Sequence, residues 1–313
     1  MSRRNLGDAS NEAERRAETA IEAVPGWTLQ GLSYEPVPGG ISNANWRIFL
    51  ADQERTYFLK VPGEGTENFI DRKAANNASM RAHEAGVGAE VVHFDPESGV
   101  EVFAFIEGLR TSTNGDFLDP VVRNNAVRAL RSFNNAKGLD LQKTLMDMID
   151  EHVGQVLALG GHFPQDFAWL NAKYREARAA LEASGLDIVP CMNDTLAGNF
   201  LLDADSNVTL VDFEYASNND RCAELALWFG EMFFDPETEN EMVEEYFGKV
   251  ERRIVARVAV FKALADLKWS TWAMVQNKLS ALDFDYFKYG VWKHLRARAV
   301  MRDPRWDDWL KAV

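Results

Sequence analysis

Three polar residues near the middle of the sequence have the types and the spacing of a phosphate-transfer site. Asp194 and Asn199 lie five positions apart in CMNDTLAGNF, and Asp212 follows in LVDFEY. Oxygen ligands without thiolates or imidazoles suit a hard cation such as Mg²⁺. In phosphoryl transfer, one aspartate accepts the proton of the attacking hydroxyl, while an asparagine and a second aspartate hold the metal. The spacing D-x4-N followed by D-F-E therefore predicts that Asp194 is catalytic and that Asn199 and Asp212 bind Mg²⁺.

A predicted β-hairpin would bring these residues together. The apolar segments NFLL and VTLVDF flank the turn-forming residues DADSN. With the turn centred near Asp205, Asn199 lies opposite Val211 and next to Asp212. Glu214 is expected on the same side as Asp212, because alternate residues of a strand point the same way, and it is a further candidate metal ligand. A D-x4-N spacing alone more often caps a turn, so the hairpin with its second acidic motif is what favours the site.

A glycine-containing loop and a strand lysine in the first part of the chain could hold the phosphates of a nucleotide. In PGGISNANW, Gly39 and Gly40 allow the backbone to approach a phosphate, and Ser42 and Asn43 can donate hydrogen bonds to it. Lys60 ends the alternating run TYFLK, where a kinase places the cation that pairs with phosphate. Each feature alone is weak, because glycine pairs often form plain hairpin turns. Their order along the chain, before the acidic motifs, predicts a nucleotide site.

These residues need two kinds of scaffold, and the first is a sheet. The first third of the chain has the β-branched and aromatic residues, and the turn signals between them, that are typical of an antiparallel sheet. The predicted strands are 34–37, 45–50, 56–61, 90–94 and 100–106. One helix, 67–85, is predicted to lie across this sheet and to end at Gly86.

After Gly108 the periodicity becomes helical. The predicted helices are 121–137, 145–159, 164–184, 223–234, 238–276 and 286–298. The sequence therefore predicts an α+β fold with two lobes. Residues 1–107 would form a small antiparallel β lobe with one helix that binds nucleotide, and residues 108–313 a larger, mainly helical lobe with a β-hairpin, the catalytic loop and the acceptor pocket. The cleft between such lobes is the expected place for ligands.

Composition narrows the classes of function. The 313 residues are 46% hydrophobic and 26% charged, enough for a sizeable core. The net charge of −14 argues against nucleic acid or an anionic membrane as a partner and is compatible with a cationic ligand. The two cysteines and five scattered histidines show neither a disulfide framework nor zinc-site spacing. Without a signal peptide or a bilayer-spanning run, the sequence favours a cytoplasmic protein, and it leaves the oligomeric state open, a homodimer included.

Together these motifs resemble the choline/ethanolamine kinase family, within the larger group of aminoglycoside phosphotransferase-like kinases. The likeness runs from about Val37 to Tyr289. GGISNANW resembles the nucleotide loop of the family, and NDTLAGNFLL and LVDFEY resemble its catalytic and metal segments. FIEGL resembles the hinge where adenine would sit, which makes Phe105 and Glu107 nucleotide-binding candidates. The resemblance implies a protein-kinase-like fold and the use of ATP with Mg²⁺.

The segment KWSTWAMVQNKLSALDFDYFKY looks like the part of this family that lines the choline pocket. Trp269 and Trp272 share one helix face, and Tyr289 follows after a turn. Glu231, in WFGEMFF, falls where the family has an acidic residue near the ammonium group. Aromatic faces and a nearby negative charge hold a quaternary ammonium, with roughly 0.5–2 kcal/mol from each cation–π contact. Aromatic residues at helical spacing are more often core residues, so it is the resemblance that carries this prediction.

Four features depart from the family pattern. Met192 stands where histidine is usual, two residues before the catalytic aspartate, and Glu224 stands where aspartate is usual. Asn134 occupies a position at which relatives often have histidine. The acidic partner of the strand lysine is expected near residues 70–75, where Arg72, Lys73, Ala74 and Ala75 supply no acid. The acidic residues of the predicted helix that could substitute are Glu67 and Glu84.

The sequence thus predicts a small-molecule kinase that transfers the γ-phosphate of ATP to the hydroxyl of choline or ethanolamine. Because of the departures, a pseudokinase that binds nucleotide or choline without turnover is the alternative. A kinase for thiamine or an aminoglycoside is a further one, although aminoglycosides would call for several carboxylates rather than an aromatic cage. The presence of Asp194, Asn199 and Asp212 together favours an active enzyme.

Overall fold

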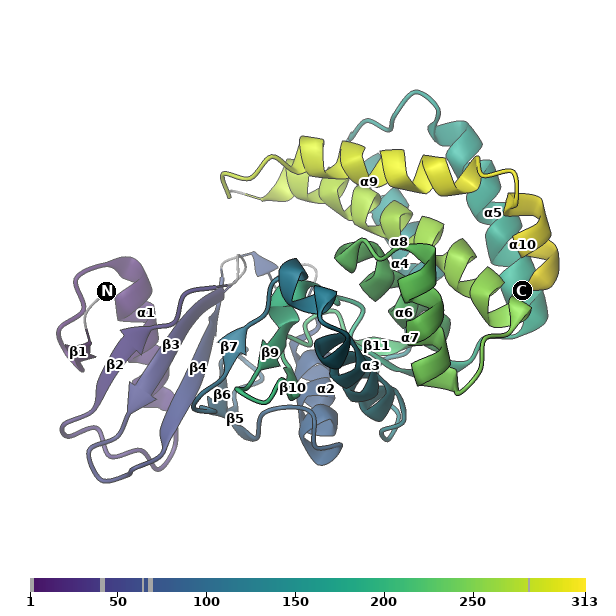
Figure 1. Cartoon of the computed structure of the whole chain (residues 1–313). Helices are drawn as coiled ribbons and strands as arrows, with labels where there is room; N and C mark the ends of the chain where they lie inside the picture. The colour runs from purple at the N-terminus through teal and green to yellow at the C-terminus, as the bar shows by residue number, and fades with distance from the viewer. Residues whose placement is uncertain (1–2, 40–42, 64, 67–69, 281) are drawn as a thin grey trace.

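The computed structural model describes residues 3–39, 43–63, 65–66, 70–280 and 282–313. The strands of the N-terminal part gather at one end of the molecule, and most helices gather at the other (Figure 1). The chain therefore has the two-lobed α+β architecture that the sequence predicts.

A six-stranded antiparallel sheet forms the small lobe, in the order β1-β2-β3-β4-β6-β5. Its strands are β1 (Arg4–Asn5), β2 (Ser33–Pro36), β3 (Asn43–Phe49), β4 (Thr56–Pro62), β5 (Val91–Phe94) and β6 (Glu101–Ala104). Two helices accompany it, α1 (Glu12–Ala23) and α2 (Arg72–Glu84). The prediction of a single helix is therefore wrong. It fails because α1 buries mainly alanines and a single isoleucine, Ile21, so that few large apolar residues mark its buried side.

Strand β4 shows how side-chain alternation gives this sheet two different faces. Leu59 and Val61 point into an apolar core that the sheet shares with α1. Phe58 and Lys60 point the opposite way and line a cleft. The register of β4 and β6 places Glu101 directly opposite Lys60. The sheet thus presents one lysine and one glutamate side by side to the cleft.

The large lobe is built around one long helix. Its helices are α3 (Pro120–Asn134), α4 (Leu145–Ala158), α5 (Phe167–Ser184), α6 (Arg221–Met232), α7 (Pro236–Phe247), α8 (Arg252–Leu279), α9 (Tyr286–Met301) and α10 (Trp306–Ala312), and a 3-10 turn spans Asn114–Leu118. Helix α8 contacts α4, α6, α9 and α10. The predicted helix 238–276 is two helices, because Gly248 takes a φ of 74° and ends α7.

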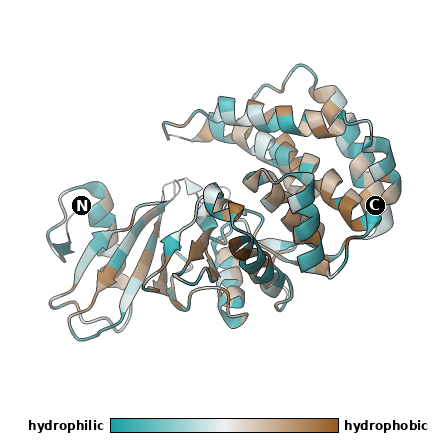
Figure 2. Ribbon diagram, viewed as in Figure 1, coloured by the Kyte–Doolittle hydropathy of each residue, from teal (hydrophilic) through white to brown (hydrophobic). Residues whose placement is uncertain are grey.

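Hydrophobic and hydrophilic residues alternate along these helices, as expected for helices that each bury one side (Figure 2). Among the described residues, no helix has both the length and the apolar character needed to cross a membrane.

The predicted hairpin is present in the large lobe, and its register is the expected one. Strands β9 (Phe200–Leu202) and β10 (Val208–Leu210) pair antiparallel. The N–H of Val211 donates to the carbonyl of Asn199 at 3.0 Å, so these residues lie opposite each other. The end of the catalytic segment is thereby fixed next to Asp212.

Further short strands complete this region. Strand β7 (Arg110–Thr111) adds to β9, and β8 (Ile188–Cys191) pairs with β11 (Ser217–Asp220). The sequence analysis missed the second pair, because β11 reads SNND and lacks the β-branched residues of a typical strand. Its pairing draws the two ends of the segment 191–217 together around the hairpin.

Candidate active site

A cleft of about 1350 Å³ lies between the sheet and the helices and collects most of the predicted site residues. The predicted residues that line it are Gly39, Asn43, Lys60, Phe105, Asp194, Asn199, Asp212, Glu214, Trp269, Trp272 and Tyr289. Gly40 and Ser42 lie outside the described residues. The cleft is large enough for a nucleotide and a small second substrate.

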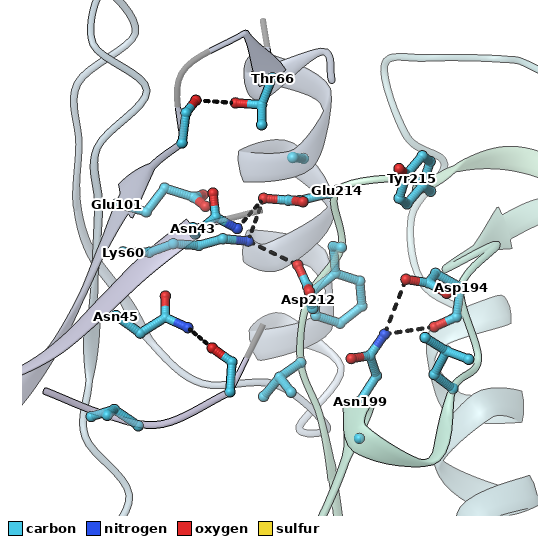
Figure 3. Close-up of a pocket in the computed structure, with 18 of the residues that line it drawn as sticks. Asn43, Asn45, Lys60, Thr66, Glu101, Asp194, Asn199, Asp212, Glu214 and Tyr215 are labelled. Atoms are coloured by element: carbon cyan, nitrogen blue, oxygen red, sulfur yellow. Dashed lines mark hydrogen bonds and ion pairs between the residues drawn. The ribbon is translucent and has the colours of Figure 1, made fainter. Parts of the chain in front are cut away.

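Asp194 and Asn199 form a hydrogen-bonded pair that lines the cleft (Figure 3). The Asn199 amide Nδ2 donates to the Asp194 carbonyl at 2.8 Å and to its Oδ2 at 3.4 Å. Asp194 is 9% exposed, and its Oδ1 has no hydrogen-bond partner in the part of the chain that the structure describes. Burial raises the pKa of Asp194, while the nearby ammonium of Lys268 opposes the rise. One carboxylate oxygen is therefore held in place, and the other is available to a ligand.

The amide of Asn199 is oriented by this contact. Because Nδ2 donates to Asp194, the side-chain oxygen points away from Asp194, toward the side where Asp212 lies (Figure 3). An amide oxygen and a carboxylate that face one space fit a hard cation such as Mg²⁺. No group of three or more His, Cys, Asp or Glu residues suited to a metal ion occurs among the described residues. A metal here would thus need oxygen ligands from elsewhere, as Mg²⁺ commonly takes from phosphates.

The loop before Asp194 is braced by the residues that depart from the family pattern. The backbone N–H groups of Met192 and Asn193 donate to the two carboxylate oxygens of Glu224, at 2.6 and 3.0 Å. Asn134 donates to the carbonyl of Pro190 at 2.6 Å and to Glu224 at 3.4 Å. Met192 itself is fully buried in the apolar core. The brace thus acts on the backbone of the loop and needs no histidine side chain at position 192.

Substitution of Glu224 by alanine is expected to lower the free energy of unfolding by about 2–4 kcal/mol, because two buried N–H groups lose their acceptor. Thermal unfolding would show this as a Tm several degrees lower. Glu224→Gln keeps one acceptor oxygen and should lose less. Glu244→Ala removes an exposed carboxylate of the same lobe and serves as the control. Equal Tm values for the Glu224 and Glu244 variants would contradict the bracing role.

Lys60 holds the two acidic residues of the D-F-E motif. Its Nζ lies 2.8 Å from Asp212 Oδ1 and 2.8 Å from Glu214 Oε1 (Figure 3). Asn43 Nδ2 also donates to Glu214 Oε1, at 2.7 Å. The expectation that Asp212 and Glu214 share a side is confirmed, but strand alternation is not the cause. Strand β10 ends at Leu210, and Asp212 takes a left-handed φ of 65°, which turns the chain there.

Glu101 is a site residue that the sequence analysis missed. It is 6% exposed, lies opposite Lys60 and accepts a hydrogen bond from Asn76 Nδ2 at 3.2 Å. Burial raises the pKa of Glu101, and the Lys60 ammonium counteracts this. Burial alone would lower the pKa of Lys60, but its acidic neighbours outweigh that effect and raise it. Side chains alternate in direction along the predicted strand 100–106, next to the strand of Lys60. This alternation was the signal from which Glu101 could have been predicted.

Asp71 caps the start of α2 by accepting from the Ala74 N–H, so the acidic residue next to Lys60 comes from the sheet rather than from helix α2. Glu84, near the end of α2, pairs instead with Arg81 at 2.6 Å. Glu67 lies outside the described residues. Asn76 is the α2 residue that reaches this cluster, through its contact with Glu101.

The predicted hinge is only partly at the cleft. Phe105 lines the cleft, and the guanidinium of Arg47 lies 4.1 Å from its ring centroid. Glu107 is exposed, forms an ion pair with Arg47 and is not among the residues that line the cleft. The assignment of both residues to nucleotide binding stays a prediction, as does the division of the chain at residues 107 and 108.

Aromatic residues form the wall of the cleft beside Asp194. The Trp269 and Trp272 rings are 5.4 Å apart and nearly perpendicular, and Tyr289 lies 6.2 Å from Trp272. Tyr215, which the sequence analysis missed, lies 5.4 Å from Trp269 and lines the cleft as well. Its position directly after the D-F-E motif is the sequence feature from which its place at the site could have been predicted. A ligand could contact several aromatic faces here and still lie within reach of the Asp194 carboxylate.

Glu231 does not line the cleft as Trp269, Trp272 and Tyr289 do. Its carboxylate forms an ion pair with Lys293 of α9. Its charge still acts nearby, because it contributes to raising the pKa values of Asp194 and Tyr289. Direct contact between Glu231 and a ligand stays a prediction.

Comparison with known proteins gives consistent similarities. The family model described as choline/ethanolamine kinase matches residues 34–247. A probable ethanolamine kinase A of Dictyostelium discoideum is 30% identical over 308 residues, which cover 83% of each chain. A choline/ethanolamine kinase of Rattus norvegicus is 24% identical and covers 92% of this chain and 86% of its own.

Solved structures agree with these sequence similarities. A choline/ethanolamine kinase family protein from Mesorhizobium loti has a TM-score of 0.82 and 27% identity, over 96% of this chain and 99% of that one. Choline kinase LicA from Streptococcus pneumoniae has a TM-score of 0.72 and 23% identity, over 85% of this chain and 94% of that one, and LicA has also been solved with AMP bound.

Proposed function

The chain belongs to the choline/ethanolamine kinase family, and on this premise we propose that it transfers the γ-phosphate of ATP to the hydroxyl of choline or ethanolamine. One observation carries the proposal. The available oxygen of Asp194 lies in the same cleft as the Lys60 cluster on one side and the aromatic wall on the other. A group that accepts a proton thus stands between a place for phosphates and a place for a cationic alcohol.

The chemistry assigns a role to each group. Asp194 Oδ1 orients the acceptor hydroxyl and takes its proton as the oxygen attacks phosphorus, and a pKa raised by burial suits a general base. Asn199 and Asp212 would hold Mg²⁺, with Glu214 beside them, and the ion would neutralise phosphate charge. Lys60 supplies a fixed positive charge at the phosphate end. Gly39 lets the backbone of the nucleotide loop pass close to phosphates, with a φ of 125°.

The acceptor end favours a small organic cation. Trp269, Trp272 and Tyr289 contribute aromatic faces, each worth roughly 0.5–2 kcal/mol to a cation. A quaternary ammonium has no hydrogen to donate, so faces of this kind are what can hold it. An aminoglycoside carries several ammonium groups and would need more carboxylates than this wall contains. The braced loop and the complete set of Asp194, Asn199 and Asp212 favour turnover over a pseudokinase.

The test is an acceptor-dependent ADP-release assay with choline, ethanolamine, thiamine and kanamycin. We expect choline or ethanolamine to give the highest kcat/KM. ATP binding without release stimulated by any acceptor would support the pseudokinase instead. Turnover of kanamycin, with none of choline or ethanolamine, would contradict the role of the aromatic wall.

A further inference from the structure

A buried lysine contacts the aromatic wall of the cleft. Lys268, on α8, is 1% exposed, and its Nζ has no hydrogen-bond partner among the residues that the structure describes. The same Nζ lies 3.0 Å from the centroid of the Trp269 ring and 4.7 Å from that of Tyr215. A buried ammonium without a hydrogen-bond acceptor is costly, so the aromatic faces are its principal contacts.

The Trp269 ring contacts this lysine and also lines the cleft. Lys268 itself lines an adjoining cavity of about 430 Å³, together with His152 and Lys143, and Tyr215 and Trp272 line both spaces. The Trp269 ring therefore already binds one cation, supplied by the chain itself. An acceptor that approaches from the cleft must share the same π-system with that internal cation.

Charged groups of both signs act on Lys268. Burial lowers the pKa of Lys268, Asp194 and Glu231 act in the opposite direction, and Lys143 and Lys293 add to the lowering. Glu231 is itself engaged by Lys293. Asp194 and Glu231 carry the negative charge that would attract a cationic acceptor. Lys268 and Lys293 partly neutralise it.

We propose that Lys268 determines acceptor specificity by weakening the attraction of Trp269 for a quaternary ammonium. This inference rests on the proposed function. A cation on one side of the ring draws the π-electrons toward itself and repels a second cation on the other side. Choline depends on aromatic faces and loses most from this competition. Ethanolamine loses less, because its primary ammonium also donates hydrogen bonds to carboxylates. Lys268 therefore shifts the preference of the cleft toward ethanolamine.

Replacement of Lys268 by methionine tests this directly, because methionine keeps an unbranched apolar stem without the charge. The KM for choline is expected to fall by roughly threefold to tenfold, within the range of one cation–π contact. The KM for ethanolamine should fall less. The KM for ATP should stay unchanged, as should the KM for dimethylbutanol, the uncharged isostere of choline. A residue that merely supports the fold would not be expected to tighten choline binding when replaced.

Two further variants control the experiment. Lys278→Met removes an exposed charge from the same helix and should leave every KM unchanged. Lys268→Arg keeps the charge and should keep the wild-type ratio of choline to ethanolamine KM. If Lys268→Met does not fold, Lys268→Gln takes its place.

The outcomes separate this inference from the proposed function. A choline KM that is unchanged or higher in the methionine variant would overturn the role of Lys268. An equal fall for dimethylbutanol would overturn it as well, since only space would have been gained. If the wild-type protein turns over neither choline nor ethanolamine, the proposed function fails. The role of Lys268 is then decided by choline binding, measured from tryptophan fluorescence in both proteins.

Discussion

Replacement of Asp194 by asparagine is expected to lower kcat by between about a hundredfold and about ten-thousandfold, the range over which a general base contributes. The substitution keeps the size and the planar shape of the side chain. It removes the carboxylate whose Oδ1 is buried and has no partner in the described part of the chain. An asparagine oxygen can still accept a hydrogen bond, but it cannot take the proton of the acceptor hydroxyl.

Steady-state kinetics with ATP and the better of choline and ethanolamine measures this effect. The KM values should stay within a few-fold of wild type, because the contribution of Asp194 is made mainly in the transition state. Asp205→Asn, in the exposed turn of the hairpin, makes the same chemical change away from the cleft and should have no effect. A kcat within tenfold of wild type for Asp194→Asn would show that another group accepts the proton.

The placement of Asp194, Asn199 and Asp212 could be predicted from sequence because local rules determine it. The turn DADSN sets the hairpin register, and the register sets which residues face each other. Asn199 opposite Val211 is the direct result. The strands around Lys60 follow equally from short-range alternation.

The residues that could not be predicted act through contacts between distant segments. Glu224 reaches the catalytic loop from 32 positions away, and Glu101 meets Lys60 only because β6 pairs with β4. The sequence around Glu224 does not indicate which backbone groups it contacts, and for Glu101 the alternation of strand 100–106 is a local signal that does not identify Lys60 as its neighbour. Lys268 belongs to the aromatic segment predicted to line the acceptor pocket, but only the packing of the rings shows that its amine is buried among them.

The same contacts bear on how the departures from the family pattern are interpreted. Each change at Met192, Glu224 and Asn134 is tolerable alone, and only together do the departures allow a pseudokinase as the alternative. In the structure these three residues belong to one cluster, in which the glutamate carboxylate accepts from the loop backbone and the asparagine. The glutamate on α6 thus holds the loop through its backbone, whichever side chain stands at position 192. This is the physical reason for favouring an active enzyme over a pseudokinase.

Replacement of Asp212 by asparagine is the second change with a large expected effect. We expect kcat to fall by at least about a hundredfold, because a metal ion contributes several kcal/mol of charge stabilisation to such reactions. The Mg²⁺ concentration for half-maximal rate should rise as well, because a neutral amide binds this ion less well than a carboxylate does. Both quantities come from one set of Mg²⁺ titrations at saturating ATP.

Glu214→Gln is a matched control, because Asp212 and Glu214 lie equally far from Lys60, at 2.8 Å. Each variant removes one negative charge next to the lysine and leaves the other in place. A loss of activity caused only by the disturbed lysine would therefore be equal in both. If Asp212 is the principal metal ligand, Asp212→Asn should lose far more activity, and higher Mg²⁺ should restore part of it. Equal losses that Mg²⁺ does not relieve would instead assign both carboxylates to holding Lys60, and would leave the metal to other residues of the cleft.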